Sequence, residues 1–250
     1  MYTLKKSLGQ HFLKDENIIL DIIDALKKEN FTHLLEVGPG AGALTKHLLQ
    51  LPGIDFKAVE LDDEKVVYLQ KAYPALQDKI IHKNFLDMDQ PFAAPFVVIG
   101  NFPYNISSQI LFKILDWKDD VPVIIGMFQK EVAERAAAKP GGKVYGVLSA
   151  LIQPFYDIEY LFDVPPDRFN PPPKVMSAVI RLRRKTTALN VRSDKAYKNL
   201  VKTAFNQRRK TLRNAVKSLF YPDVLKDPIF DKRAEALGIE DFAALTFKMQ

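Results

Sequence analysis

Residues 34–45 read LLEVGPGAGALT, and this stretch decides the fold. An apolar run leads into Gly38, Gly40 and Gly42, and a helical pattern follows over 43–51. Glycine has no Cβ, so the backbone here can turn sharply and approach a ligand closely. A strand, a glycine turn and a helix in this order are typical of the ligand-binding turn of a doubly wound α/β sheet.

The remainder of the first 182 residues alternates between strand patterns and helix patterns. Strands are predicted at 33–37, 56–61, 79–84, 95–100, 121–128, 157–164 and 175–182, and helices at 16–28, 63–73, 106–116, 130–139 and 145–156. Strands separated by helices predict a parallel, doubly wound α/β sheet with helices on both faces. The last two strands are close in sequence and predict a hairpin at one edge of that sheet.

After about residue 185 no strand pattern remains. Four short helical segments follow, and we place a domain boundary near 186–190. We therefore expect residues 1–185 to form a ligand-binding α/β domain with an N-terminal arm. Residues 186–250 are expected to form a small all-helical domain.

The composition excludes several classes of protein. The chain has 250 residues and no cysteine, which rules out disulfides and thiolate zinc sites. Its four histidines show no metal-ligand spacing, so no metal is expected. No run of 18 apolar residues is present, and the N-terminus lacks the apolar segment of a signal peptide. These features favour a cytoplasmic protein without a membrane partner.

The net charge of +6 is unevenly distributed along the chain. Residues 181–217 contain thirteen lysines and arginines against a single acid, Asp194. A solvated helix face usually mixes both signs of charge, whereas a one-sided excess favours a polyanion as partner. The charge pattern therefore favours nucleic acid binding by the C-terminal part.

The glycine turn by itself suits two adenosine-containing cofactors. The second strand ends at Glu60, twenty residues after Gly40, and a carboxylate there can accept hydrogen bonds from both ribose hydroxyls. NAD and S-adenosylmethionine both carry such a ribose. Asn84 follows the third strand and could present its amide oxygen to the adenine amine. A plain tight turn without a ligand remains a third interpretation.

The sequence after the fourth strand, GNFPY at 100–104, separates these cofactors. NAD chemistry has no need of this pattern, but methyl transfer to an aromatic amine does, because the adenine N6 lone pair is delocalised into the ring. The side-chain oxygen of Asn101 and the backbone carbonyl of Phe102 can each accept one N6 hydrogen, and Pro103 restricts the direction of that carbonyl. Tyr104 offers a face for base stacking. Alignment and placed acceptors then suffice, without a strong general base.

At these residues the chain resembles the ribosomal RNA adenine N6,N6-dimethyltransferases, a family that modifies two adjacent adenosines near the 3′ end of small-subunit (16S) rRNA. The matching stretches are SLGQHFLKD (7–15), LEVGPGAGALT (35–45), VELD (59–62), GNFPYNISSQIL (100–111), MFQKEVAER (127–135), FNPPPKVMSAV (169–179) and AFNQRRKTLRN (204–214). The resemblance implies a Rossmann-like methyltransferase sheet, S-adenosylmethionine as methyl donor, and a role in late small-subunit biogenesis.

The resemblance also implies roles for individual residues. The expected donor-site residues are His11, Leu13, Gly38, Gly40, Glu60, Asn84 and Asn101. The expected catalytic residues are Asn101, Phe102, Pro103, Tyr104 and Phe169, with Phe169 facing the target base opposite Tyr104. The chain departs from the family pattern at two positions. Phe102 stands where the family usually has leucine, and Asn84 where it usually has aspartate, which predicts a weaker grip on the donor.

The basic tail is expected to contact RNA phosphates, which position a substrate without reading its sequence. The expected contacts are Arg208, Arg209, Lys210 and Arg213 on helices, with Arg209 and Arg213 on one helix face, and Lys5, Lys6 and Gln10 in the arm. The expected partner is small-subunit rRNA or the pre-30S particle, bound by a monomer. The target base must leave its stack, which is easier in a loop or a partly assembled subunit.

Three other functions remain open from the sequence. The chain could be an RNA-binding ribosome assembly factor in which catalysis is secondary. It could methylate adenine N6 in large-subunit rRNA or in DNA, although the RRKTLRN segment and the positive tail favour the small subunit. It could also be an NAD-dependent oxidoreductase, which would bind NADH and not S-adenosylhomocysteine.

Overall fold

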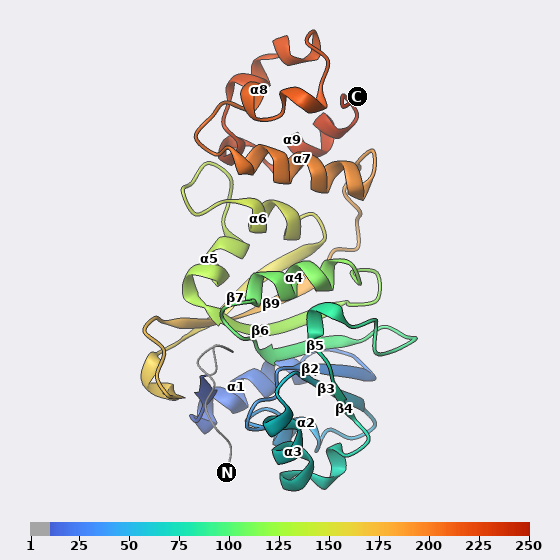
Figure 1. Cartoon of the computed structure of the whole chain (residues 1–250), viewed down its shortest axis with the longest axis vertical. Helices are drawn as coiled ribbons and strands as arrows, with labels where there is room; N and C mark the ends of the chain where they lie inside the picture. The colour runs from blue at the N-terminus through green and yellow to red at the C-terminus, as the bar shows by residue number, and fades with distance from the viewer. Residues whose placement is uncertain (1–10) are drawn as a thin grey trace. The chain divides into compact units, whose positions relative to one another are not determined.

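The computed structural model describes residues 11–250 (Figure 1). Its internal contacts divide the chain into two compact units, Met1–Ala133 with Ile158–Arg184, and Glu134–Asp157 with Lys185–Gln250. The second unit therefore takes in residues 134–157 in addition to the predicted helical tail. The functional division at residues 185 and 186 stays a prediction.

The first unit is built on a seven-stranded sheet with the order β4-β3-β2-β5-β6-β9-β7. The strands are β2 (His33–Val37), β3 (Asp55–Glu60), β4 (Ile80–His82), β5 (Val97–Asn101), β6 (Val123–Gln129), β7 (Tyr156–Val164) and β9 (Ser177–Arg184). The pairs β3–β4, β2–β3, β2–β5 and β5–β6 are parallel, and β9 runs antiparallel to β6. The predicted strands near 157–164 and 175–182 are neighbours at one edge of this sheet.

The order of the strands positions the ligand site. From β2 the chain moves outward to β3 and β4, then returns to β5 on the other side of β2. Ligands of open parallel sheets bind beyond the carboxyl ends of the strands at such a reversal. The glycine turn after β2 and the GNFPY turn after β5 consequently lie at the same edge of the sheet (Figure 1).

The first unit holds the helices α1 (Glu16–Lys27), α2 (Thr45–Leu48), α3 (Asp63–Ala72) and α4 (Ser107–Leu115), and the start of α5 (Lys130–Ala137). Asp15 caps α1 by accepting from the backbone N–H of Asn17 and of Ile18. The helix predicted over 43–51 is regular only within α2. On either side of α2 the chain forms turns, in which backbone N–H groups donate to carbonyls three or four residues earlier.

The second unit is helical, as the sequence predicts for its larger segment. It holds α6 (Val147–Ile152), α7 (Asp194–Asn206), α8 (Leu212–Ala215) and α9 (Ile239–Thr246), with 3-10 turns between α8 and α9. The Tyr197 hydroxyl of α7 donates to the Ala150 carbonyl of α6 and ties the two helices together. One of the four short helical segments predicted after residue 185, PIFDKRAEALG at 228–238, forms two separate 3-10 turns, Pro228–Asp231 and Ala234–Ala236. Within residues 11–250, no helix has both the length and the apolar character to cross a membrane.

Candidate active site

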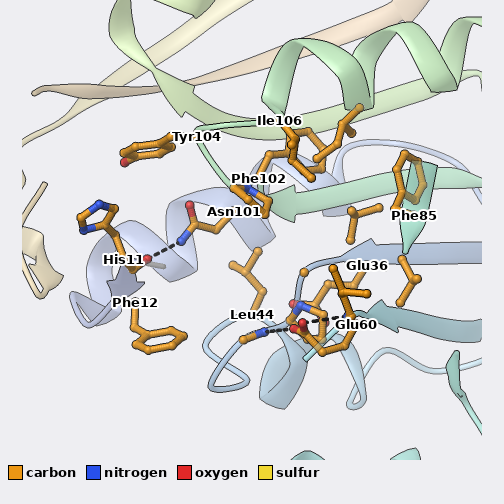
Figure 2. A pocket seen from close by; sticks show the side chains of 18 of the residues that line it. His11, Phe12, Glu36, Leu44, Glu60, Phe85, Asn101, Phe102, Tyr104 and Ile106 are labelled. Atoms are coloured by element: carbon orange, nitrogen blue, oxygen red, sulfur yellow. Dashed lines mark hydrogen bonds between the residues drawn. The ribbon is translucent and has the colours of Figure 1, made fainter. Parts of the chain in front are cut away.

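A single pocket collects the turns that follow β2, β3, β4 and β5, together with the arm strand β1 (Phe12–Leu13) (Figure 2). The predicted site residues that line it are His11, Leu13, Gly38, Gly40, Glu60, Asn84, Asn101, Phe102, Pro103 and Tyr104. The structure thus brings ten predicted residues from five segments to one place. Their individual roles stay predictions.

The glycine turn needs its glycines for two reasons. Gly40 and Gly42 have φ angles of +57° and +85°, which side-chain-bearing residues rarely adopt. A Cβ at Gly40 would also lie 2.9 Å from the ring of Phe12, and one at Gly42 only 2.4 Å from the ring of Tyr73. The turn is therefore packed tightly against the arm on one side and against the end of α3 on the other.

Glu60, the last residue of β3, is fixed by backbone amides. Its Oε1 accepts from the N–H of Leu61 at 2.9 Å and of Asp62 at 3.0 Å, and its Oε2 accepts from the N–H of Gly40 at 3.2 Å. Burial raises the pKa of this carboxyl, while the three amide bonds oppose the rise. The carboxylate is held against the glycine turn, with oxygen lone pairs left for further donors.

Glu36 is a pocket residue to which the sequence reasoning gave no role. It lies in β2 with only 1% of its surface exposed, and the Thr45 hydroxyl donates to its Oε2 at 2.7 Å. Burial raises the pKa of Glu36 to about 8, and the nearby charge of Glu60 acts in the same direction. The group is therefore mostly protonated and neutral at pH 7.

Asn101 ends β5, and its amide is oriented by the arm. Its Nδ2 donates to the backbone carbonyl of His11 at 3.0 Å, which leaves the oxygen turned to the side of Tyr104 (Figure 2). The arm itself is held by antiparallel pairing of β1 with β8 (Phe169–Asn170). The direction of the carboxamide oxygen is thus set by two segments, the end of β5 and the arm, which are 90 residues apart in the sequence.

Phe102 is buried, and two glycines make the space for its ring. A Cβ at Gly100 would lie 2.9 Å from the Phe102 ring, and one at Gly126 only 2.3 Å from it. The ring packs edge-on against Phe128, with centroids 5.0 Å apart, and the Phe102 N–H donates to the Met127 carbonyl at 3.2 Å. The backbone of the turn is consequently fixed to β6.

Tyr104 is half-buried, and two side chains contact it, one at the face of its ring and one at its phenol oxygen. The ring stacks on that of His11, with centroids 5.4 Å apart and an interplanar angle of 28°. The phenol forms a hydrogen bond with the hydroxyl of Ser177. Burial raises the pKa of the Tyr104 phenol, so it stays protonated at neutral pH.

Asn84 lines the pocket at the start of the 3-10 turn Phe85–Asp87. Its side-chain oxygen accepts from the N–H of Leu86 at 3.1 Å, and its Nδ2 donates to Asp87 at 2.7 Å. A carboxylate can only accept hydrogen bonds, so this contact keeps the NH₂ on the side of Asp87. The amide oxygen retains a lone pair for a ligand N–H.

Phe169, the expected partner of Tyr104, lies in the core beside the arm. It is 1% exposed, belongs to the hydrophobic core together with Leu13, and is not among the described residues that line the pocket. In the pairing of β1 with β8 it lies opposite Leu13. Its role opposite Tyr104 stays a prediction.

The basic residues of the tail fall into two groups. Arg208 donates to the Lys143 carbonyl at 2.5 Å and lies 3.7 Å from a carboxylate oxygen of Glu235. Arg213 donates to the Leu225 carbonyl and pairs with Asp231 at 2.9 Å. By contrast, Arg209 and Lys210 are exposed and form no ion pair within residues 11–250.

One structural expectation for the tail was wrong. Residues 207–210 form the turn between α7 and α8, so Arg209 and Arg213 do not share a helix face. The run is rich in good helix formers and has no glycine or proline, so local propensity gave no sign of the break. The arm residues Lys5, Lys6 and Gln10 lie outside the described residues.

Two contacts of the site were missed for different reasons. Phe12 lies beneath Gly40 and was adjacent to predicted residues, so its neighbourhood gave some signal. Ser177 touches Tyr104 from 73 residues away, and nothing in the local sequence indicates this. Contacts of that kind depend on the packing of distant strands.

Comparison with known proteins gives concordant matches. The family model described as "Ribosomal RNA adenine dimethylase" matches residues 1–246. A relative from Cytophaga hutchinsonii, named "Ribosomal RNA small subunit methyltransferase A", is 51% identical over 97% of this chain and 95% of its own length. A relative of the same name from Phocaeicola vulgatus is 52% identical over 98% of this chain and 89% of its own length.

Solved structures agree with the fold. A dimethyladenosine transferase from Plasmodium falciparum superimposes with a TM-score of 0.78 at 27% identity, over 93% of this chain and 94% of that one. The 23S rRNA methyltransferase ErmE superimposes with a TM-score of 0.70 at 22% identity, over 95% and 99%, which shows the shared fold alone. The predicted Rossmann-like α/β class is confirmed, and the match across nearly the whole chain shows that it belongs to the ribosomal RNA adenine dimethylase family.

Proposed function

We propose that this chain transfers methyl groups from S-adenosylmethionine to the N6 amines of two adjacent adenosines near the 3′ end of small-subunit rRNA. It does so as a cytoplasmic monomer acting on a pre-30S particle late in subunit assembly. Membership of the family supports the activity, rRNA adenine dimethylation. The observation that carries the proposal is the pocket, which joins a nucleoside-binding glycine turn to the Asn101–Tyr104 turn.

The residues of the pocket fit an adenosine-bearing donor. Glu60 lies at the end of β3 with free oxygen lone pairs, where it can accept from ribose hydroxyls. Gly38 leaves its backbone open to close approach, since a Cβ there would meet nothing nearer than Pro103 at 3.6 Å. Asn84 offers an acceptor oxygen for the adenine amine. The donor supplies a methyl group made electrophilic by its sulfonium.

The acceptor amine is the part of the reaction that this chain's residues activate. The Asn101 oxygen and the Phe102 carbonyl can each accept one N6 hydrogen, which favours a pyramidal nitrogen with its lone pair projecting outward. Both acceptors are fixed in advance, one by the His11 carbonyl and the other by the bond of Phe102 to β6. Acceptors placed before the reaction stabilise the developing positive charge at no cost of reorganisation.

Tyr104 serves as a stacking surface and not as a base. Its phenol is already bonded to Ser177, and burial raises its pKa, so it holds its proton. No strong base is needed, because the amine proton leaves after the C–N bond begins to form. Turnover then depends on alignment of the base against the donor methyl.

The RNA substrate is held by the second unit. Lys195, Lys198 and Lys202 are exposed on the face of α7 opposite its buried side chains, and Arg209 and Lys210 are exposed in the turn that follows the helix. Phosphate contacts of this kind position an RNA without reading its sequence. This placement supports the pre-30S particle as partner.

The alternatives have less support. The relatives are named for the small ribosomal subunit, which does not favour a large-subunit rRNA or DNA target. An assembly factor with secondary catalysis would not need a complete set of acceptors, and here the pocket keeps both. The oxidoreductase has no support from the family match.

The test combines product mapping with one variant. Small subunits from a strain that lacks the modification are incubated with labelled S-adenosylmethionine, and the product is mapped by mass spectrometry. The wild-type chain should add two methyl groups to each of two adjacent adenosines. Asn101→Ala should lower turnover by at least about 100-fold, as expected for losing a fixed transition-state acceptor, while binding to immature subunits persists. Methylation of another RNA, or full activity in Asn101→Ala, would contradict the proposal.

A further inference from the structure

The hydroxyl of Ser177 contacts the phenol of Tyr104, although 73 residues separate them. Ser177 is the first residue of β9 and is completely buried. Ser177 is not among the described residues that line the pocket, but its hydroxyl contacts Tyr104, which does line it. Any effect it has on catalysis must pass through Tyr104.

Ser177 is a fixed point in the sheet. It lies opposite Gln129 in the antiparallel pairing of β9 with β6. The residues just beyond this pair are also bonded, with the Lys130 N–H donating to the Met176 carbonyl at 2.9 Å. Because its backbone is held on this ladder, the hydroxyl can move only by rotation about χ1 and gives its partner a nearly fixed anchor.

The ring of Tyr104 needs such a fixed point, because its other contacts leave it free to tilt. Stacking on His11 supports one face of the ring but still allows the ring to slide and tilt against the imidazole. The Ser107 hydroxyl donates to the Tyr104 carbonyl at 3.3 Å and fixes only the main chain. The bond to Ser177, at the far end of the ring, removes the remaining tilt.

We propose that Ser177 is a positioning residue for methyl transfer, whose hydroxyl holds the Tyr104 ring at the tilt on which the target adenine stacks. The inference rests on the proposed function, in which that ring is the stacking surface. If the ring were loose, the adenine stacked on it would tilt with it. Its N6 would then move away from the Asn101 and Phe102 acceptors. Small misplacements of this kind lower the rate without altering the donor site.

The experiment is a double-mutant cycle with Ser177→Ala, Tyr104→Phe and the two combined. We measure kcat/KM on small subunits that lack the modification, and the Kd for S-adenosylhomocysteine by calorimetry. Each single change removes the same hydrogen bond and should lower kcat/KM by about tenfold, the size expected for one buried bond. The Kd should stay within about twofold, and Ser177→Ala should add nothing in the Tyr104→Phe background.

Ser149→Ala is the matched control, because Ser149 is a buried serine of the second unit whose hydroxyl donates to the Arg135 carbonyl. It should lower thermal stability and leave kcat/KM unchanged. An unchanged kcat/KM in Ser177→Ala, or an equal loss in both tyrosine and phenylalanine backgrounds, would overturn the inference. If Ser177→Ala is too unstable to assay, full activity of Tyr104→Phe would overturn it as well. A wild-type chain that fails to methylate small subunits would instead refute the proposed function.

Discussion

At the scale of single residues, Glu36 makes the stability of the folded chain depend on pH. Its pKa of about 8 in the folded chain compares with an ordinary value of 4.5. Between these values the folded chain keeps the proton that the unfolded chain has released, so rising pH favours unfolding. The contribution is about 1.4 kcal/mol per pH unit within this window.

Glu36→Gln should remove this dependence, because an amide does not titrate and its oxygen can still accept from Thr45. The melting temperature of the variant should rise relative to that of the wild type between pH 6 and pH 8. Calorimetry without donor measures the two curves. If they run parallel over this range, Glu36 is already ionised in the folded chain.

The residues whose positions the sequence predicts best are those at or just after the ends of strands. Gly38, Glu60 and Asn101 lie in one pocket because parallel strands bring their carboxyl ends to one edge of the sheet. The contact of Ser177 with Tyr104 and the burial of Phe169 depend on how distant segments pack. Packing at that range leaves no periodic signal in the chain.

At the scale of elements, β6 and the turn after β5 are matched in shape. Gly126→Ala would place a Cβ 2.3 Å from the Phe102 ring and 2.7 Å from that of Phe128. We expect a loss of about 1–3 kcal/mol in the free energy of unfolding, the usual cost of overpacking a core. Denaturant unfolding of the variant measures this loss.

Phe102→Leu should relieve part of that clash, because the smaller side chain frees the space that the new methyl group needs. The two changes together should therefore cost at least about 0.5 kcal/mol less than their sum. Additive losses would show that Phe128 alone makes the clash.

The same scale shows where local pattern fails. The strands and α1 were predictable, since apolar spacing and the Asp15 cap are local features. The turn at 207–210 was not, because strong helix formers occupy a segment that tertiary packing bends. The hydrogen bonds from Arg208 to the Lys143 carbonyl and from Arg213 to the Leu225 carbonyl are part of that packing.

At the scale of the whole molecule, the excess of positive charge is concentrated in residues 181–217, but the structure divides it. Arg181 pairs with Glu29 and Glu159 in the first unit and is 6% exposed, so it is not available to RNA. Arg209 and Lys210 are exposed on the second unit. A count of charges along the chain overstates the binding surface, because part of the charge is neutralised inside the fold.

The individual basic residues of the tail should therefore contribute unequally to RNA affinity. Arg209→Ala and Lys210→Ala should each reduce the slope of log K against log salt by about 1, the value for one lost phosphate contact. Arg208→Ala should change it less, because its guanidinium is already bonded to the Lys143 carbonyl. Lys27→Ala, which removes an exposed charge of α1, is the control for net charge. Equal slopes for Arg209→Ala, Lys210→Ala and Lys27→Ala would place the RNA contacts elsewhere, since only a residue that touches a phosphate releases a counterion when RNA binds.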